Sequence, residues 1–229
     1  MTPPARQASV AAMVWDLPLR LYHWALVLLF VVAYVGGSRL GYYGLHKSAG
    51  YGILGLLVFR LIWGFVGPEP ARFASFIKGP AAALGHLKEL LRRQHRPLPG
   101  HNPMGGWAVV AILALVLVQT VSGLFATTFD YEGPLARLLP DAGQDMMARL
   151  HAFNMNLLLV LLAIHLLGIA VTSVLGRENL VASMIHGRKE LQVSDLAAVR
   201  QVPRWLAPLV AALSALAVSA ILALPRLFG

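Results

Sequence analysis

The stretch HAFNMNLLLVLLAIH, from His151 to His165, is apolar enough to lie in a lipid bilayer, yet it carries an imidazole at each end. An α-helix turns about 100° and rises about 1.5 Å per residue, so this spacing brings both rings to within about 40° of one face, at depths about 21 Å apart. Ionisable side chains deep in a membrane span are costly and usually functional. The stretch therefore predicts a membrane helix that presents two histidines on one side.

The rest of the chain is equally apolar. Of its 229 residues, 58% are hydrophobic and only 13% are charged, whereas about 25% are charged in an ordinary soluble domain. Runs long enough to cross a hydrocarbon layer of roughly 30 Å lie at about 17–36, 45–66, 104–127, 151–175 and 207–224. We expect an all-α integral membrane protein in which residues 1–190 form a four-helix transmembrane domain. Residues 191–229 are expected to form a linker and an extra C-terminal transmembrane helix.

The chain contains no cysteine. This excludes disulfides, iron–sulfur clusters, thiolate-bound zinc and covalently attached c-type haem. A metal centre in this protein must therefore use histidine, methionine, carboxylate or backbone ligands.

The net charge of +9 is concentrated in the second and fourth connections between spans. Loops rich in lysine and arginine face the cytoplasm in membrane proteins, so these connections are expected inside, with the N-terminus inside and the C-terminus outside. No nucleic-acid partner is expected. The basic residues of these two connections are Arg72, Lys78, Lys88, Arg92, Arg93 and Arg96, then Arg177, Arg188, Lys189, Arg200 and Arg204. The opposite side carries Arg39, Arg137 and Arg149 together with Asp130, Glu132, Asp141 and Asp145.

Two further features mark the inner side. The stretch GPAAALGHLKELLRR, residues 79–93, places Leu84, Leu87 and Leu91 on one helical face, which fits either a helix on the membrane surface or a solvated connector. Tryptophans are expected at the inner ends of spans as an aromatic belt; these are Trp15, Trp63, Trp107 and Trp205.

With this topology, four histidines fall at two depths. His46 and His151 open spans that start on the outer side, whereas His23 and His165 lie about 20 Å deeper. Haem b needs one axial ligand from each side of its ring, and two histidines give a closed electron-transfer centre. Each facing pair therefore predicts one haem b, with the iron of the inner haem on His23 and His165 and that of the outer haem on His46 and His151.

Small residues accompany His46 along its span. Gly50, Gly52 and Gly55 would clear a helix surface for a bulky macrocycle, or they are helix-packing contacts. No ligand role is assigned to the histidines of the inner loops, which are His86, His95, His101 and His186.

Histidines also serve metal transporters and proton pathways. Such sites normally add carboxylates, and every acidic residue of this chain falls outside the apolar runs. A haem-free metal transporter or membrane anchor is therefore a less favoured alternative.

Several short motifs occur in a characteristic order: VWDLPLRLYHW at 14–24, GHNPMGGW at 100–107 and HGRK at 186–189, together with the histidine quartet. In this combination the chain resembles the bacterial cytochrome b561 family, which includes the cytochrome b subunits of nickel–iron hydrogenases. The resemblance covers about residues 14–189. The last span lies outside it.

The resemblance implies a haem-binding bundle with two b haems in a bacterial inner membrane, exchanging electrons with the quinone pool. The donor it implies is a periplasmic cytochrome, a hydrogenase or another redox partner. One branch of the family implies an alternative, a stand-alone superoxide:ubiquinone oxidoreductase. The sequence leaves open both the donor and a homodimer.

Three polar residues are candidates for binding the propionates of the inner haem. Arg60 lies fourteen residues after His46, on the same helical face, where it would clamp an inner propionate or extend its charged end to the inner surface. Arg20 and Asn102 are weaker candidates for the same inner propionates. Nothing in the sequence resembles a nucleophile with a base or a pair of catalytic carboxylates, so we expect electron transfer through cofactors and no catalytic side chain.

Overall fold

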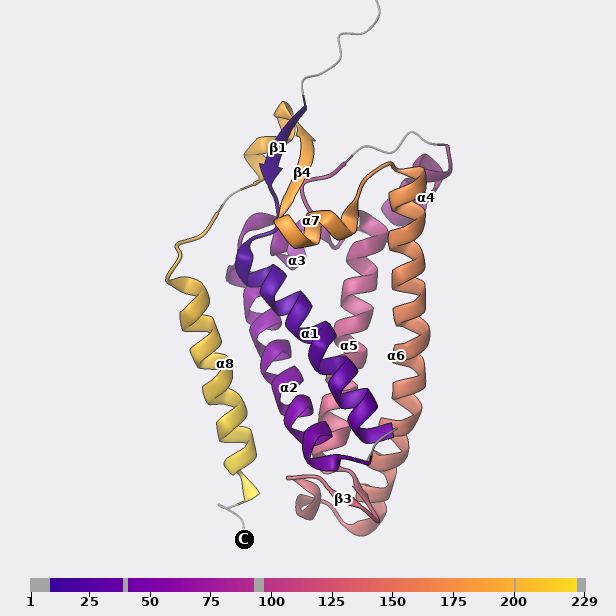
Figure 1. Ribbon diagram of the computed structural model, residues 1–229, viewed down its shortest axis with the longest axis vertical. Coiled ribbons are helices and arrows are strands. Elements are labelled where there is room, and N and C mark those ends of the chain that lie inside the picture. Colours follow the sequence, from indigo (N-terminus) through magenta and orange to yellow (C-terminus); the bar gives the residue numbers. More distant parts are fainter. Residues whose placement is uncertain (1–8, 39–40, 93–96, 200, 226–229) are drawn as a thin grey trace, which may run out of the picture. The chain divides into compact units, whose positions relative to one another are not determined.

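The computed structural model describes residues 9–38, 41–92, 97–199 and 201–225. Its long helices are α1 (Leu17–Ser38), α2 (Tyr43–Val66), α5 (Pro103–Phe125), α6 (Asp141–Leu175) and α8 (Leu206–Ala223), shown in Figure 1. These 5 helices are long and apolar enough to cross a membrane, which confirms the predicted spans. Of the residues considered above, Arg39, Arg93, His95, Arg96 and Arg200 lie outside the described residues.

Short elements connect the long helices. The connection after α2 contains η1 (Glu69–Ala71), α3 (Phe73–Phe76) and α4 (Pro80–Leu91). The connection after α5 contains β2 (Thr127–Thr128), β3 (Tyr131–Glu132) and η2 (Ala136–Leu138). After α6 come α7 (Leu180–His186), β4 (Arg188–Gln192) and η3 (Val193–Ala198), and β1 (Ser9–Met13) precedes α1.

Helix α6 begins earlier than the apolar run predicted. Its 35 residues start at Asp141 and not near His151. The hydropathy pattern missed this segment because Asp145 and Arg149 interrupt it. An acidic residue in the first turn, here Asp141, favours a helix start because it complements the positive end of the helix dipole. The charged residues from Asp141 to Arg149 therefore lie on the helix and not in a loop.

The chain divides into two compact units. Unit 1 comprises Met1–Arg20, Trp63–Val109 and Ile164–Pro203; unit 2 comprises Leu21–Ile62, Val110–Ala163 and Arg204–Gly229. In unit 2, parts of α1, α2, α5 and α6 run side by side in Figure 1. Helix α8 packs through Val218 into an apolar cluster with Leu54, Leu124 and Leu135.

Unit 1 contains a short ribbon that the sequence analysis did not predict. Strands β1 and β4 pair antiparallel from Ser9 opposite Gln192 to Met13 opposite Arg188, and they lie side by side in Figure 1. Gly187 makes the approach possible: its φ is +85°, and an added Cβ would come within 2.6 Å of the Trp15 carbonyl oxygen. Its own carbonyl accepts hydrogen bonds from the amides of Val14 and Trp15. The HGRK motif thus joins the end of α7 and the start of β4 to the segment that leads into α1.

Asp16 fixes the start of α1 within unit 1. Its Oδ1 accepts from the Leu19 amide at 3.3 Å, and its Oδ2 accepts from Trp63 Nε1 at 3.0 Å. Trp63 and Trp15 are 1% and 4% exposed, so the predicted belt role is wrong for these two. Trp63 is buried because its indole nitrogen has a carboxylate partner inside the unit. Trp107 and Trp205 are exposed, as the belt requires.

The loop stretch from residue 79 does form a helix, α4. Its buried side chains are His86 and Leu90, whereas Leu84 and Leu91 are 61% and 64% exposed. The leucine face predicted from the sequence is thus turned outward, which agrees with a helix whose apolar face meets the membrane surface.

Candidate functional site

Unit 2 brings the outer pair, His46 of α2 and His151 of α6, together. Their ring centroids are 5.9 Å apart with an interplanar angle of 76°. Metal–imidazole bonds of about 2.0 Å imply that two rings holding one metal from opposite sides have centres about 6 Å apart. The spacing therefore suits a single metal ion between them.

Both rings are fixed through the same nitrogen. Nδ1 of His46 donates to the Ala33 carbonyl of α1 at 2.8 Å, and Nδ1 of His151 donates to the Gln119 carbonyl of α5 at 2.9 Å. A carbonyl oxygen can only accept, so Nδ1 carries the proton in each ring. This leaves Nε2 as the nitrogen that could bind a metal, an arrangement typical of metal-ligating histidines.

A glycine lies against each ring. A Cβ added to Gly37 would come within 2.6 Å of His46 Nδ1, and one added to Gly123 within 2.9 Å of His151 Cε1. Real Cβ atoms do not approach that closely, so a side chain at either position would displace the imidazole. Only glycine lets α1 and α5 press against the histidines of α2 and α6.

The glycines predicted beside His46 have different surroundings. A Cβ on Gly52 would meet Leu29 of α1 and one on Gly55 would meet Val218 of α8. These two are helix-packing glycines, the second of the two interpretations. Gly50, one turn after His46, has nothing within 4 Å of an added Cβ and therefore borders open space on the His46 face.

Further polar side chains support His151. Asn154 is 2% exposed, and its Nδ2 donates to the Leu115 carbonyl and to Gln119 Oε1 at 2.9 and 2.7 Å. Ser122 Oγ lies 3.3 Å from His151 Nδ1. These contacts hold α5 and α6 together next to the Gln119 carbonyl, which accepts the hydrogen bond from His151.

The segment after α5 adds Tyr131 to the site. Its hydroxyl donates to the Gly123 carbonyl at 2.8 Å, and its ring meets the His46 ring edge-on at 6.3 Å. Lys47 Nζ lies 5.5 Å from the centre of the Tyr131 ring. Burial, and to a lesser degree the neighbouring Tyr51, raises the pKa of the Tyr131 phenol to about 12. Tyr131 is therefore a neutral hydrogen-bond donor beside the outer pair.

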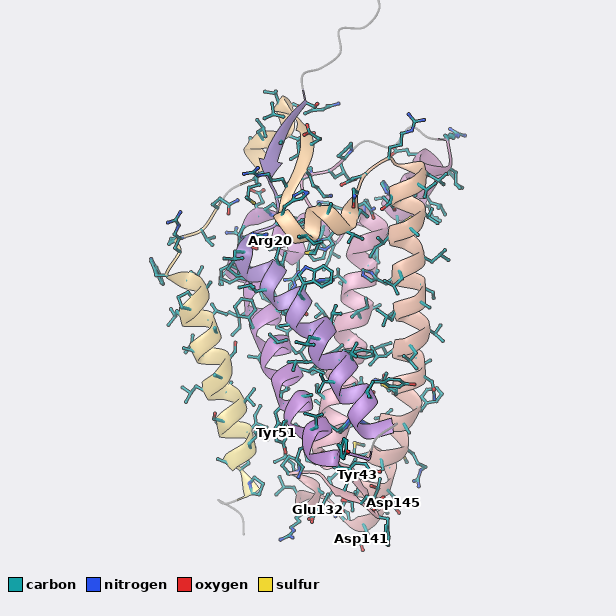
Figure 2. The ribbon with its side chains drawn as sticks, viewed as in Figure 1. Arg20, Tyr43, Tyr51, Glu132, Asp141 and Asp145 are labelled. Carbon is teal, nitrogen blue, oxygen red and sulfur yellow. The ribbon has the colours of Figure 1, made fainter. Side chains whose placement is uncertain are left out.

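Charged groups of both signs surround this end of unit 2. Figure 2 shows Glu132, Asp141 and Asp145 there, with Tyr43 and Tyr51 beside them. A hydrogen bond from the Arg137 guanidinium at 2.8 Å lowers the pKa of the Glu132 carboxyl. The two signs in proximity explain why net charge alone does not select a partner for this surface.

The other two histidines of the quartet, His23 and His165, belong to different units. His23 lies on α1 in unit 2, half-buried, with its ring edge-on to Trp24 at 5.1 Å. His165 lies half-buried on α6 in unit 1. Their pairing stays a prediction.

Arg60 is 2% exposed on α2. A side chain this buried does not extend into water, which disfavours the surface alternative. Its role toward a propionate stays a prediction.

Arg20 and Asn102 have structural contacts in unit 1. Arg20 lies beside α7 in Figure 2 and donates to the Ile185 carbonyl at 2.5 Å. Asn102 Oδ1 accepts from the Gly105 amide at 2.7 Å and so caps α5. These contacts account for both residues locally, and their roles toward a cofactor stay predictions.

Sequence reasoning missed the residues that fix the outer pair: Gly37, Gln119, Ser122, Gly123, Asn154 and Tyr131. A signal was present for Gln119 and Asn154, because buried amides inside apolar spans need partners. No signal marked the glycines, since glycine is common in membrane helices.

The chain is similar to a family of known membrane cytochromes. The family model for prokaryotic cytochrome b561 matches residues 14–187. A protein of Azotobacter chroococcum mcd 1 is 28% identical over 78% of this chain and 88% of its own length. A second, from Azotobacter vinelandii, is 27% identical with the same coverage, and a third, from Rhizobium leguminosarum bv. viciae, is 24% identical over 77% and 87%. All three carry the name "Probable Ni/Fe-hydrogenase B-type cytochrome subunit". No solved structure matches the chain significantly.

The protein is thus a multi-pass membrane cytochrome of the b type. It belongs to the prokaryotic cytochrome b561 family, as the match over residues 14–187 shows, and electron transport is the role that this family implies.

The outer pair fits the haem b that the family implies. The rings are 5.9 Å apart, both Nδ1 protons are used by carbonyls, and Gly50 borders open space one turn from His46. Among the described residues, no group of three or more histidine and acidic side chains could hold a metal ion. The geometry of His46 and His151 is compatible with two axial ligands, and their role as ligands stays a prediction.

Proposed function

We propose that this protein carries electrons across the bacterial inner membrane between a periplasmic redox partner and the quinone pool, using two b haems. The observation that supports it most is the outer pair, His46 and His151, with its matched backbone carbonyls. Bound haem supplies one-electron redox chemistry at its iron. The protein's part is to hold, orient and shield the cofactor.

The ligand roles follow the sequence prediction. His46 and His151 bind the outer haem iron through Nε2, and His23 and His165 bind the inner one. Arg60, with Arg20 and Asn102 as weaker candidates, contacts the propionates of the inner haem. Tyr131 covers the edge of the outer site with a neutral, hydrogen-bonded phenol.

The names of the relatives support the partner class, and the charge distribution supports the orientation. We propose a hydrogenase-type or cytochrome donor that docks beside the outer pair, with the N-terminus cytoplasmic and the C-terminus periplasmic. The basic loops support this orientation. A reporter enzyme active only outside the cytoplasm, fused after Gly229, should be active, whereas one fused before α1 should not.

We further propose that residues 1–190 suffice for haem binding and that residues 191–229 add a linker and a supporting helix. Val218 packs against the cluster around Leu54, which supports such a role for α8. A chain that stops after Ala198 keeps the whole of β4, and it should retain the haem content of the full chain.

The central experiment measures haem content and the reduced-minus-oxidised visible spectrum of protein purified in detergent. Wild type should hold about two b haems per chain, and His151→Ala should lose about one of them. His186→Gln changes an exposed histidine with no ligand role and should keep both.

Other outcomes discriminate among the functions. A full haem complement in His151→Ala would remove the ligand role of the outer pair. Absence of haem from folded, haem-supplied protein would contradict the proposal as a whole. Rapid superoxide oxidation by the purified chain alone, coupled to ubiquinone reduction, would favour the stand-alone enzyme over the relay.

A further inference from the structure

Unit 1 contains a hollow of about 600 Å³ where α6 ends and the chain leads into α7. Its apolar wall is a single stripe of α6, since Leu166, Ile169, Ala170 and Ser173 follow the three- and four-residue spacing of one helical face. Val181 of α7 also lines the hollow. None of these residues has a role in the proposed electron path.

The polar end of the hollow is formed by Arg177 and Asn179. Arg177 is exposed, and its side chain makes no hydrogen bond or ion pair with another described residue. The adjacent acidic residue does not neutralise it, because Glu178 is paired with the buried Lys189 at 2.6 Å. Asn179 Oδ1 accepts from the Ala182 amide, which leaves the NH₂ group of Asn179 to donate. The hollow thus ends in a cation and an amide donor.

The backbone holds Arg177 in an unusual conformation. Its φ is +54°, the one positive φ among the non-glycine residues that the structure describes. This left-handed region disfavours residues with a Cβ, and glycine is the usual residue just past a helix end. The arginine in this place adds a permanent positive charge to the lining of the hollow.

The dimensions suit one leaflet of a membrane. From Leu166 to Leu175, the last residue of α6, the helix rise is about 14 Å, close to half of a hydrocarbon core of roughly 30 Å. Leu166, Leu167 and Val174 on this part of α6 are exposed by 58%, 63% and 75%, as expected for a surface that faces lipid tails. Basic pockets at the cytoplasmic ends of spans bind anionic head groups.

We infer that this hollow is a binding site for an anionic phospholipid. Arg177 and the Asn179 amide contact the phosphate of the head group, and one acyl chain lies along the stripe from Ser173 to Leu166. A neutral quinone head would not use the charge of Arg177, which is why the lipid is favoured. The inference stands on unit 1 alone and does not depend on haem ligation or on the proposed electron donor.

The test counts the lipids that the haem-loaded protein retains in mild detergent, by native mass spectrometry. The protein is first incubated with mixed micelles of that detergent and either phosphatidylglycerol or phosphatidylcholine. Wild type should retain phosphatidylglycerol preferentially. Arg177→Gly suits the left-handed backbone and should lower that retention about fivefold, the effect of about one interfacial charge. Arg177→Lys should keep most of it. Ala170→Trp places a bulky side chain in the hollow and leaves the charge of Arg177 in place, and it should also lower the retention of phosphatidylglycerol.

Arg188→Gln is the matched control, because it removes an exposed positive charge of unit 1 outside the hollow, and it should behave as wild type. Equal retention of both lipids by wild type, or unchanged retention in Arg177→Gly, would overturn the inference. Displacement of phosphatidylglycerol by an equimolar neutral quinone would assign the hollow to quinone and overturn it as well. Haem content is read from the same samples, so failure of the proposed function is seen separately.

Discussion

Gly37 and Gly123 occupy equivalent positions relative to the outer pair. Each lies four residues after the carbonyl that accepts from a histidine Nδ1, Ala33 for His46 and Gln119 for His151, and each would drive a Cβ to within 3 Å of that ring. The helix pairs α1–α2 and α5–α6 thus hold their histidines in the same way, through a carbonyl that accepts from Nδ1 and a glycine that lies against the ring. The sequences AYVGG and QTVSG share only the valine and the last glycine, so the common element is backbone geometry.

Replacing either glycine with alanine should displace its imidazole. Gly37→Ala should have the larger effect, because its Cβ would be 2.6 Å from His46 Nδ1 against 2.9 Å for the nearest His151 atom. Overpacking of this kind costs about 1–3 kcal/mol of folding stability, and the outer haem should be lost or shifted in potential. The measurement is haem content with a redox titration. Gly44→Ala is the control, since its Cβ meets nothing within 4 Å; equal effects at all three positions would refute this arrangement.

Asn154→Leu should weaken the attachment of α6 to α5. The change leaves Gln119 Oε1 without its buried donor, a loss of about 1–3 kcal/mol, and it loosens the residue whose carbonyl fixes His151. We expect a lower thermal unfolding temperature and an altered outer-haem potential, the inner one unchanged. Asn156→Leu removes an exposed amide two residues away and should change neither quantity. A variant of Asn154 with wild-type potentials would show that the amide network does not position the ligand.

The spans could be predicted because each is a continuous run of apolar residues, which is visible without knowledge of the fold. The approach of His46 and His151 could be predicted because the rise per residue of a helix converts a position along a span into a depth in the membrane. The start of α6 was missed because charges such as Asp145 end an apolar window without ending a helix.

Contacts between distant segments could not be predicted. The β1–β4 pairing joins residues 9–13 to 188–192, and the partners of Gly37 and Gly123 depend on how closely two helices approach. The same holds for Asp16: it directly precedes the first span in the sequence, and its carboxylate accepts a hydrogen bond from the buried Trp63, a contact between residues 47 positions apart.

Raising the pH should lower the folding stability of the protein, because the Tyr131 phenol beside the outer pair loses its proton more readily in the unfolded chain. Its pKa is raised from 10.0 to about 12 by burial, so between these values the unfolded chain loses the phenolic proton while the folded chain keeps it. Stability from this group is complete below pH 10 and is lost as the pH rises towards about 12. Thermal unfolding followed from pH 8 to 11 should show this decline in wild type.

Tyr131→Phe is the matched variant. It should be less stable by about 0.5–1.5 kcal/mol at neutral pH, because the hydrogen bond to the Gly123 carbonyl is lost, and its alkaline decline should be shallower. Parallel curves for the two proteins would mean that another group causes the decline.

Arg60→Leu should lower the midpoint potential of the inner haem. Removing a nearby positive charge stabilises the oxidised iron relative to the reduced iron, and the buried position of Arg60, 2% exposed, limits screening by water and salt. Arg60→Lys keeps the charge and should restore much of the potential, though not a two-pronged hydrogen bond. Identical titrations for wild type and Arg60→Leu would remove the propionate role.

Asp16→Asn tests whether the buried carboxylate fixes the start of α1. Asparagine is as good an N-cap as aspartate, so the contact from the Leu19 amide at 3.3 Å should survive. The contact from Trp63 Nε1 at 3.0 Å would lose its charged acceptor, and hydrogen bonds to charged groups contribute about 1.5–3 kcal/mol. Asp16→Ala removes both contacts and should cost about 1 kcal/mol more. Thermal unfolding of these two variants and of Trp63→Phe separates the contribution of the capping contact from that of the contact with Trp63. If Asp16→Asn and Trp63→Phe are each as stable as wild type, the capping contact alone explains the aspartate.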